Sequence, residues 1–600
     1  MVSMKIRYLN GIRLKRAIIA GSNTVIRNRE RLNKINVFPV ADGDTGTNMA
    51  GTLQSISGAL HTCMDNTVHG IIRTAADSAL LGARGNSGAI LAQYLHGLAN
   101  ELSNKITVTT VSFGQAAYRA VDYAYNAISN PREGTILTVI KRWAAAIHEK
   151  AGHTEDFVEV LKASLSSAKK ALAETPEQLP VLKKAGVVDA GAMGFIEMLE
   201  GMFHFIQHGK LKELEIYTEE IADAEPTITA EMEDIPFQFC TECLIEDSGI
   251  DHSSLRSALV DFGDSLIVAG SSSKTKIHIH TNEPREVFRI AGEYGTVIDE
   301  KADDMRNQFH SAHAEHGDVA IVTDTACDLP PDLVKAHRIH MVPLRVLFGN
   351  KTYVDKLSLS PEDFYNLLRD HPDIQPTTSQ PTPADFLNKF EFLGAHYRSI
   401  LAFTLAGALS GTTESARSAA RNTAGEKQIS VIDTRQVSVG IGLVVRRVAE
   451  ALADGCSAEE AQALAEHLVP RTGLLVAVPS LDALIRGGRV GRMQGALGRL
   501  LNLKPIIALD ETGKAVKAST AFGMEGSKKK ILRMLEDRLD TNQPVDFAIA
   551  HVDAPEQARW FADRLNRSFT PDHKIFTQDA SPVLAAHAGF GAVAVAYLIP

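Results

Sequence analysis

Hydrophobic patterning changes character partway along this 600-residue chain, and the change limits the folds open to it. Up to about residue 215, apolar residues recur at helical spacing, as they do from Ile90 to Leu98. Alanine-rich stretches such as Ala75–Leu81 suit close packing between helices. Beyond Gly317, short β-branched runs alternate with longer Ala- and Leu-rich stretches. Since one hydrophobic core seldom serves more than about 250–300 residues, we predict several domains of different class.

The C-terminal alternation is typical of an α/β domain whose mostly parallel sheet is covered by helices. A short mixed segment precedes it, with strand-like alternation from Lys276 to His280. Before that segment, Thr218–Asp234 is acidic, contains Pro226 and has no Lys or Arg, as expected of a solvated linker. The predicted strands of the C-terminal region include Val319–Thr323, Ile429–Ile432, Leu474–Val478 and Phe547–His551. The predicted segments are an all-α domain over 1–215, an acidic linker over 216–235, a small α+β domain over 236–312 and an α/β domain over 318–600.

Charge and cysteine content argue against several classes of protein. A net charge of -10 and a pI near 6.1 do not suit a phosphate-backbone binder, so we expect no nucleic acid partner. Five scattered cysteines make no disulfide framework and fit a reducing cytosol. The N-terminal residues to Arg16 lack the apolar stretch of a signal peptide, and no apolar run reaches the roughly 18 residues that span a bilayer. We therefore expect a cytoplasmic protein without a transmembrane segment.

The densest chemistry of the first region is Asp42-Gly43-Asp44, followed by Thr47 and Asn48. Two carboxylates separated by one glycine can point at one hard cation, and Mg²⁺ prefers such ligands together with substrate phosphates. Thr47 and Asn48 add hydrogen-bond donors where a helix can begin, which suits an anion. The plain alternative is an Asx-turn that binds nothing.

Two standard sites are excluded in this region. An EF-hand counted from Asp42 fails because Gly46, Thr47 and Leu53 stand at its fifth, sixth and twelfth positions. The chain has no G-x-x-x-x-G-K-[ST] motif, which excludes a standard P-loop. Three further small-residue turns offer other anion cradles: Gly82–Gly88, Pro131–Thr138 and Gly186–Ala192.

Taken in order, these motifs over residues 5–210 resemble the nucleotide-binding domain of the dihydroxyacetone kinase family (DhaL), in the form found in the ATP-binding subunit of bacterial fatty acid kinases. The resemblance implies a barrel of antiparallel helices that binds Mg²⁺-ATP at one end. Asp42 and Asp44 would be the catalytic pair that holds Mg²⁺, with Asn36 in the place of a third ligand that is an aspartate in the dihydroxyacetone enzymes. Thr47, Asn48, Ser87 and Gly88 would contact phosphates, and Asp189 would lie near the nucleotide lid.

The middle segment holds residues of the types that bind zinc. On a strand, His278 and His280 project from one face, so both can reach one ion. Cys240 and Glu242 would share a face in the same way. The plain alternative is an exposed pair of histidines and a buried pair of cysteines. The segment also resembles the middle domain of the fatty acid kinase subunit, which implies a structural or docking zinc held by Cys240, His278 and His280. The fourth ligand stays open between Glu242, Cys243 and water.

Polar constellations follow predicted strands of the C-terminal region, where ligands of open α/β sheets bind. They are Thr378–Pro381, Ser410–Thr412 and His587–Gly591. Their hydroxyl and imidazole groups can hold a carboxylate beside an acyl tunnel, although each motif alone is also ordinary turn chemistry.

With Ile321–Thr325, Val431–Thr434, Gly487–Val490 and Leu501–Pro505, these motifs resemble the DegV family of fatty-acid-binding proteins over 318–600. The resemblance implies two α/β lobes around a fatty acid whose carboxylate is held by Thr378, Ser410 and His587. Arg489 joins this set and would face the partner domain or the phosphate. At Thr325-Ala326-Cys327 the chain departs from the family's usual Ser-Thr-Ala, and nothing functional follows from that.

Together the resemblances imply a fatty acid kinase in one chain, which transfers the ATP γ-phosphate to a bound fatty acid carboxylate. The alternative is a fatty-acid-binding and delivery protein whose DhaL-like domain only senses nucleotide. A dihydroxyacetone-type kinase is disfavoured because nothing in 318–600 resembles that family's substrate domain. The expected ligands are ATP, Mg²⁺, a fatty acid and structural Zn²⁺. Transient membrane contact during lipid loading and a homodimer stay open, as do acyl-chain preference and the acceptor of the acyl phosphate.

Overall fold

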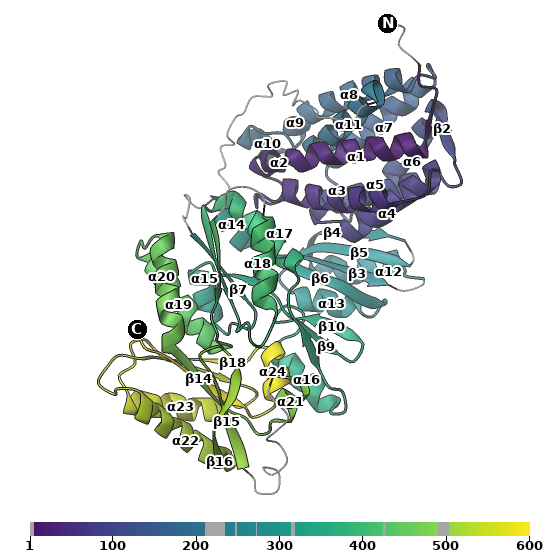
Figure 1. Cartoon of the computed structure of the whole chain (residues 1–600). Helices are drawn as coiled ribbons and strands as arrows, with labels where there is room; N and C mark the ends of the chain where they lie inside the picture. Colours follow the sequence, from purple (N-terminus) through teal and green to yellow (C-terminus); the bar gives the residue numbers. More distant parts are fainter. Residues whose placement is uncertain are drawn as a thin grey trace. The chain divides into compact units, whose positions relative to one another are not determined.

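The computed structural model describes residues 5–209, 235–246, 249–271, 273–313, 319–423, 428–489 and 503–600. The chain divides into two compact units, Met1–His313 and Ala314–Pro600, each with its own hydrophobic core. Figure 1 colours both units along the sequence. The predicted acidic linker over 216–235 lies outside the described residues except for Ile235, as do Val490, Leu501 and Asn502.

The first unit begins with a closed ring of helices, which confirms the predicted all-α barrel. Each long helix packs against the next in the order α1, α3, α4, α5, α6, α7, α8 and α11, and α11 returns to pack on α1. A two-stranded antiparallel ribbon, β1 (Tyr8–Asn10) with β2 (Thr107–Thr109), lies beside the start of α1. The helices are α1 (Gly11–Arg27), α2 (Arg29–Lys34), α3 (Thr45–Thr62), α4 (Val68–Gly82), α5 (Gly85–Glu101), α6 (Thr110–Asn126), α7 (Ile136–Ala151), α8 (Phe157–Ala173), α9 (Thr175–Gln178), α10 (Pro180–Ala185) and α11 (Ala190–His208).

Local sequence explains where these helices begin and end. Thr109 and Ser112 form a reciprocal capping box at the start of α6. Asp189 caps α11 by accepting the Ala192 N–H at 2.8 Å, and Gly209 ends that helix in the left-handed conformation. Small residues then allow close packing, as at Gly21, where an added Cβ would lie 2.5 Å from the Met198 carbonyl of α11.

The middle segment is a four-stranded antiparallel sheet with helices, in the order β4-β5-β3-β6, which confirms the predicted α+β class. Its β4 strand joins the helical core, because Ile267 and Ala269 pack with the barrel residues and the Gly270 N–H donates to Gln93 Oε1 of α5 at 2.9 Å. The barrel and this sheet therefore form one compact unit. Its elements are β3 (Phe239–Glu246), α12 (His252–Leu259), β4 (Gly263–Gly270), β5 (Lys274–Thr281), α13 (Pro284–Ala291), β6 (Thr296–Asp304) and α14 (Met305–His313), with a 3-10 turn at Val260–Phe262.

The second unit has two lobes, as predicted. The first is built on a parallel sheet in the order β13-β12-β7-β8 and a small antiparallel sheet in the order β10-β9-β11. Its elements are β7 (Val319–Asp324), α15 (Pro331–Ala336), β8 (His340–Val342), β9 (Arg345–Phe348), β10 (Lys351–Val354), α16 (Pro361–Asp370), β11 (Thr377–Ser379), α17 (Pro383–His396), β12 (Ser399–Thr404), α18 (Thr412–Asn422), β13 (Gln428–Asp433), α19 (Val439–Ala453) and α20 (Ala458–Leu468).

The second lobe corrects the expectation of a mostly parallel sheet. Its six strands run in the order β16-β15-β14-β19-β17-β18, and only β17 and β18 are parallel. Both faces carry packed apolar cores, so its buried strands show the same β-branched runs as parallel ones and the pattern does not reveal their direction. Its elements are β14 (Thr472–Ala477), α21 (Asp482–Arg486), β15 (Leu503–Leu509), β16 (Ala515–Phe522), α22 (Gly523–Arg538), β17 (Asp546–His551), α23 (Pro555–Ser568), β18 (Phe576–Asp579), α24 (Pro582–Ala588) and β19 (Val593–Leu598), with a 3-10 turn at Val469–Arg471 before β14.

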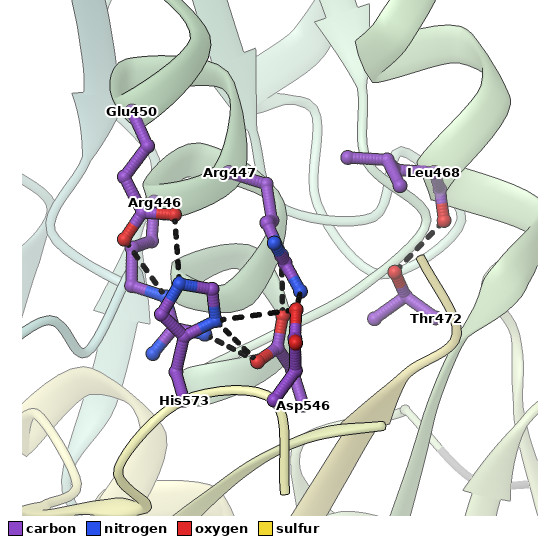
Figure 2. A network of polar contacts seen from close by, with 8 residues as sticks. Arg446, Arg447, Glu450, Leu468, Thr472, Asp546 and His573 are labelled. Atoms are coloured by element: carbon purple, nitrogen blue, oxygen red, sulfur yellow. Dashed lines mark hydrogen bonds and ion pairs between the residues drawn. The ribbon is translucent and has the colours of Figure 1, made fainter. Parts of the chain in front are cut away.

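A buried polar network ties α19 to the second lobe (Figure 2). The Asp546 carboxylate at the start of β17 forms ion pairs with Arg446 Nη2 at 2.7 Å and with Arg447 Nε at 2.5 Å. His573 Nδ1 lies 2.9 Å from the same carboxylate, and Arg447 also reaches Asp572. Asp546 is fully buried, and removing its charge from water costs free energy. The two guanidinium groups offset that cost.

Across the described ranges, none of the helices combines the length and apolar character needed to cross a membrane.

Candidate functional site

The first candidate site lies where the loop after α2 leads into α3. Asn36 Nδ2 donates to Asp42 Oδ1 at 2.7 Å and to the Val40 carbonyl at 3.2 Å, which folds the loop back on itself. Asn48 Nδ2, one turn into α3, donates to Asp44 Oδ2 at 2.8 Å. The structure thus brings three predicted magnesium ligands together and orients two of them through amide groups. Asn36, however, uses its amide nitrogen on Asp42, which makes it an orienting residue in this arrangement.

The two aspartates repel each other, with Asp42 buried and Asp44 half-buried. Burial, followed by the charge of Asp44, raises the pKa of Asp42 well above its usual range. Burial also raises the pKa of Asp44, against the opposing effect of Lys301 on β6. Two adjacent buried carboxylates of this kind favour a cation between them or a shared proton. This electrostatic arrangement fits the predicted magnesium site.

A second loop, at the start of α5, forms the other wall of this site. Gly85 has a left-handed φ of 59°, and a Cβ there would lie 2.7 Å from Asn48 Nδ2, so the position requires glycine. Gly88 is equally confined, because a Cβ would lie 2.5 Å from Thr52 Oγ1. The glycines thus let the backbone of α5 approach α3 and put Asn86 and Ser87 beside the aspartates.

The predicted nucleotide residues divide into two groups. Asn48 and Ser87 line the same pocket as Asn36, Asp42 and Asp44, with a cavity volume of about 40 Å³. Among the described residues, the other three make packing or capping contacts, and their nucleotide roles stay predictions. Thr47 is hydrogen-bonded to Asn33, Gly88 allows close packing, and Asp189 caps α11. Burial raises the pKa of Asp189 to about 7.

The zinc-type residues of the middle sheet line this same pocket. Ligand atoms of Cys240, His278 and His280 all lie within 4.8 Å of one another. Cys240 pairs directly with His280 across β3 and β5, which follows from the antiparallel register. The sequence predicts the zinc cluster and the aspartate pair separately, with a structural or docking role for zinc. The structure places the zinc-type cluster and the aspartate pair in one pocket. Their segments lie about 200 residues apart, and no sequence motif links the two.

The two imidazoles of the cluster have the same pattern of partners. His278 Nδ1 lies 3.0 Å from Glu242 Oε1, and His280 Nδ1 lies 3.3 Å from Asp264 Oδ1. Carboxylates paired with one ring nitrogen commonly orient a metal-binding histidine whose other nitrogen is the ligand. His278 Nε2 is buried and has no hydrogen-bond partner in the described part of the chain, which leaves it available to a metal. Cys240 Sγ is near the same ring, 3.8 Å from its Nδ1.

This donor set of one thiol and two imidazoles fits zinc, which takes Cys and His ligands in a tetrahedral arrangement. Among the described side chains, neither Glu242 nor Cys243 joins the three within the 4.8 Å limit. Of the predicted fourth ligands, the geometry therefore favours water.

The second candidate site is a cavity of about 460 Å³ in the second unit. Apolar side chains from β14, β15, β19 and α24 line most of it, including Leu474, Ile507, Ala594 and Leu584. All four predicted fatty-acid residues also line it, namely Thr378, Ser410, His587 and Arg489. Gln380 of the predicted motif Thr378–Pro381 lines the cavity too. So does Ser438, which sequence reasoning missed, and its strained backbone (φ 57°) is visible only in the structure.

The polar residues of this cavity form pairs. Thr378 Oγ1 lies 2.9 Å from His587 Nε2, and Ser410 Oγ lies 2.9 Å from Thr412 Oγ1. Burial, followed by the charge of Arg489, lowers the pKa of His587 to about 4, so the ring is neutral near pH 7. The cavity therefore offers hydroxyl and imidazole groups for hydrogen bonding and one guanidinium for charge.

Family models match three stretches of the chain. Residues 39–204 match the DAK2 domain, residues 236–312 match the FakA-like middle domain of fatty acid kinase, and residues 318–599 match the family described as uncharacterised protein, DegV family. The three matches follow one another without overlap, so the chain is a fusion of three kinds of domain. In particular, the chain joins a DAK2 domain, a FakA-like middle domain and a DegV domain in one polypeptide, as the sequence predicts.

Two curated relatives each cover about half of the chain. Protein YloV of Bacillus subtilis is 37% identical over 320 residues, which cover 51% of this chain and 58% of that protein. An uncharacterised protein of Staphylococcus haemolyticus is 35% identical over 308 residues, which cover 50% of this chain and 56% of that protein. The matched region thus spans a little over half the length of these relatives.

Solved structures that resemble this chain cover a little under half of it. A DegV family protein from Thermus thermophilus, titled for its fatty acid binding, is 29% identical and covers 47% of this chain and 99% of its own, with a TM-score of 0.44. DegV of Bacillus subtilis, titled a fatty acid binding protein, is 26% identical with the same coverage and a TM-score of 0.44.

Proposed function

We propose that this protein is a fatty acid kinase in one chain, which converts ATP and a fatty acid into ADP and an acyl phosphate. The observation that carries the proposal is the buried Asp42–Asp44 pair facing the glycine loop of α5, in a chain that also holds a large apolar cavity with a polar group. The fatty acid kinase-type middle domain between them in the sequence supports the same function. The proposed segments are those predicted from the sequence, 1–215, 216–235, 236–312 and 318–600.

In this proposal the aspartate pocket receives the phosphate end of the nucleotide. A volume of about 40 Å³ holds ions and water, so the rest of the nucleotide would lie outside it. Asp42 and Asp44 would hold Mg²⁺, which would neutralise charge on the transferred phosphoryl group. Asn36 and Asn48 keep the two carboxylates oriented, and Ser87 with the α5 amides that follow Gly85 would contact phosphate oxygens.

The acceptor needs no general base. A fatty acid carboxyl titrates near about 4–5, so its carboxylate is the nucleophile at pH 7. Thr378, Ser410 and neutral His587 would hold the carboxylate by hydrogen bonds, and Arg489 would attract its charge. Catalysis then comes from alignment of a carboxylate oxygen with the γ-phosphate and from charge stabilisation.

Zinc belongs to the proposal as a neighbour of the aspartate pair. Cys240, His278 and His280 would hold it, and a bound zinc ion would supply positive charge beside the carboxylates. Fusion of kinase and carrier raises their effective concentration, to about the millimolar range for a short flexible linker. Transfer within one chain and transfer between the chains of a homodimer both fit the proposal, as does a cytoplasmic location with transient membrane contact during lipid loading.

The test is acyl phosphate formation, trapped as hydroxamate. Purified protein is incubated with Mg²⁺-ATP and saturated and unsaturated fatty acids in the presence of hydroxylamine. We expect hydroxamate that requires fatty acid, that disappears in an Asp42→Asn/Asp44→Asn variant and that falls in Ser410→Ala. If no hydroxamate forms while fatty acid copurifies with the protein, the kinase proposal fails and the chain is a carrier with a nucleotide-sensing domain.

A further inference from the structure

One buried carboxylate of β3 contacts both the candidate metal site and the candidate nucleotide loop. Glu242 Oε1 accepts the Gly85 backbone N–H at 2.7 Å and lies 3.0 Å from His278 Nδ1. Its other oxygen lies 3.5 Å from Lys276 Nζ on β5. Glu242 is only 2% exposed, so these contacts are made away from bulk water.

The contacts of this group define its geometry. One oxygen of Glu242 faces both His278 Nδ1 and the Gly85 N–H, and Lys276 lies beside the other oxygen. A histidine whose Nδ1 donates to a carboxylate keeps its Nε2 for a metal. Glu242 is therefore placed to select the tautomer that the metal site needs.

The same oxygen acts on α5. Gly85 is the first residue of that helix, and Arg84 at its N-cap makes no side-chain capping bond. A carboxylate at a helix N-terminus satisfies an unpaired amide and is favoured by the helix dipole. Glu242 thus caps α5 from a strand about 157 residues further along the chain. The cap sets where Asn86 and Ser87 lie.

Asp264 shows what Glu242 adds. Asp264 is the carboxylate partner of the second histidine, His280, at 3.3 Å, but its side chain is 54% exposed. Both acids can therefore orient a metal ligand, and of these two only Glu242 contacts Gly85.

We propose that Glu242 is a positioning residue that couples zinc binding to nucleotide binding, through one oxygen shared by His278 and the Gly85 amide. This coupling rests on the proposed function for the identity of the two ligands. Zinc fixes the His278 ring, the ring fixes the Glu242 carboxylate, and the carboxylate fixes the start of α5. By linkage, the nucleotide must strengthen zinc binding by the same factor.

The coupling is measured by binding, without turnover. The full chain is stripped of zinc with a chelator, and Mg²⁺-ADP affinity is measured by calorimetry with and without added zinc. Zinc affinity is measured separately by competition with a chromogenic chelator. We expect zinc to tighten Mg²⁺-ADP binding of the wild type by about fivefold or more. Equal Mg²⁺-ADP affinity with and without zinc in the wild type would overturn the proposal whether or not any variant folds.

Variants then separate Glu242 from its neighbours. Glu242→Gln should lower zinc affinity by about 10–100-fold, the usual effect of losing an orienting partner. In this variant, Mg²⁺-ADP affinity should be nearly the same with and without zinc. Asp264→Asn should lower zinc affinity and keep the coupling. Glu246→Gln is the matched control, since Glu246 lies on β3 in an exposed pair with Lys274, and it should change neither.

Two results would contradict this account. Unchanged coupling in Glu242→Gln would mean that zinc acts on the nucleotide without Glu242. Higher zinc affinity in that variant would mean that the metal uses Nδ1 of His278 and that Glu242 competes with it. Neither result depends on acyl phosphate formation, so a failed kinase assay with intact coupling would count against the proposed reaction and not against Glu242.

Discussion

The two units each contain a cluster of metal-type side chains, and the clusters differ in how their charges are compensated. In each, the ligand atoms of three residues lie within 4.8 Å of one another: Cys240, His278 and His280 in one, and Asp546, Asp572 and His573 in the other. Arg446 and Arg447 already pair with Asp546, and Figure 2 shows both arginines directed at its carboxylate. In the first cluster the carboxylates of Glu242 and Asp264 pair with the histidines instead, and His278 Nε2 is buried without a partner among the described residues.

The difference shows that ligand type and spacing do not identify a metal site by themselves. Guanidinium groups satisfy the Asp546 carboxylate as a metal would, so the second cluster is complete without an ion. The orphaned nitrogen of His278 and the carboxylates behind both histidines are what single out the first cluster. The second cluster then serves stability, because it ties α19 to β17.

The largest expected effect tests this contrast by zinc content. His278→Ala should remove zinc from the purified chain, from about one equivalent to near none, because it deletes one of the three protein ligands. His573→Ala is the matched change in the other cluster and should leave zinc content unchanged. Elemental analysis after gel filtration makes the measurement. Retained zinc in His278→Ala, or zinc lost in His573→Ala, would reverse the assignment of the two clusters.

Removal of the central acid of the second cluster should cost stability instead. Asp546→Asn leaves Arg446 and Arg447 without their buried counter-ion, a change that costs about 3–5 kcal/mol in comparable pairs. Urea unfolding followed by a probe in the second unit gives the free energy. Zinc content serves as the control and should not change. A loss below about 1 kcal/mol would show that the network is dispensable.

Acid should weaken the second cluster in a defined window. Burial works to raise the pKa of Asp546, but Arg446, His573 and Arg447 lower it below its usual value. A depressed pKa means that this stabilisation is present above the unfolded value of about 3.9 and is lost as pH falls through the folded value. Thermal melts from pH 6 to pH 3 should therefore fall less steeply in Asp546→Asn than in the wild type. Parallel curves would contradict the assigned charge pairing.

The smallest effect is expected at the rim of the same cluster. Asp572 is 36% exposed in its pair with Arg447, so Asp572→Asn should cost no more than about 1 kcal/mol. The same urea titration measures it. A loss as large as that of Asp546→Asn would mean that exposure does not govern the energetics of this network.

Sequence reasoning predicted the class of each domain because periodicity and family motifs can be recognised within short stretches of the sequence. The helical spacing around Ile90 and the motif at Asp42-Gly43-Asp44 needed no tertiary information. Strand direction in the second lobe was predicted wrongly, since buried strands look alike whether parallel or antiparallel.

Long-range contacts were beyond sequence reasoning. The Glu242–Gly85 hydrogen bond joins β3 to α5, and neither residue has a local signature of the other. Glu242 was weighed only as a zinc ligand, because its residue type and spacing fit that role equally well. The buried arginine pairing of Asp546 was equally hidden, since it depends on how α19 packs.

The central claim is that the fatty acid carboxylate itself attacks the γ-phosphate of ATP. A fatty acid labelled with ¹⁸O in both carboxyl oxygens is turned over with Mg²⁺-ATP and hydroxylamine, and the released phosphate is analysed by mass spectrometry. Hydroxylamine attacks the acyl carbon, so the account predicts phosphate that carries one ¹⁸O from the carboxylate. Unlabelled phosphate would show that water attacks ATP, which would contradict the claim.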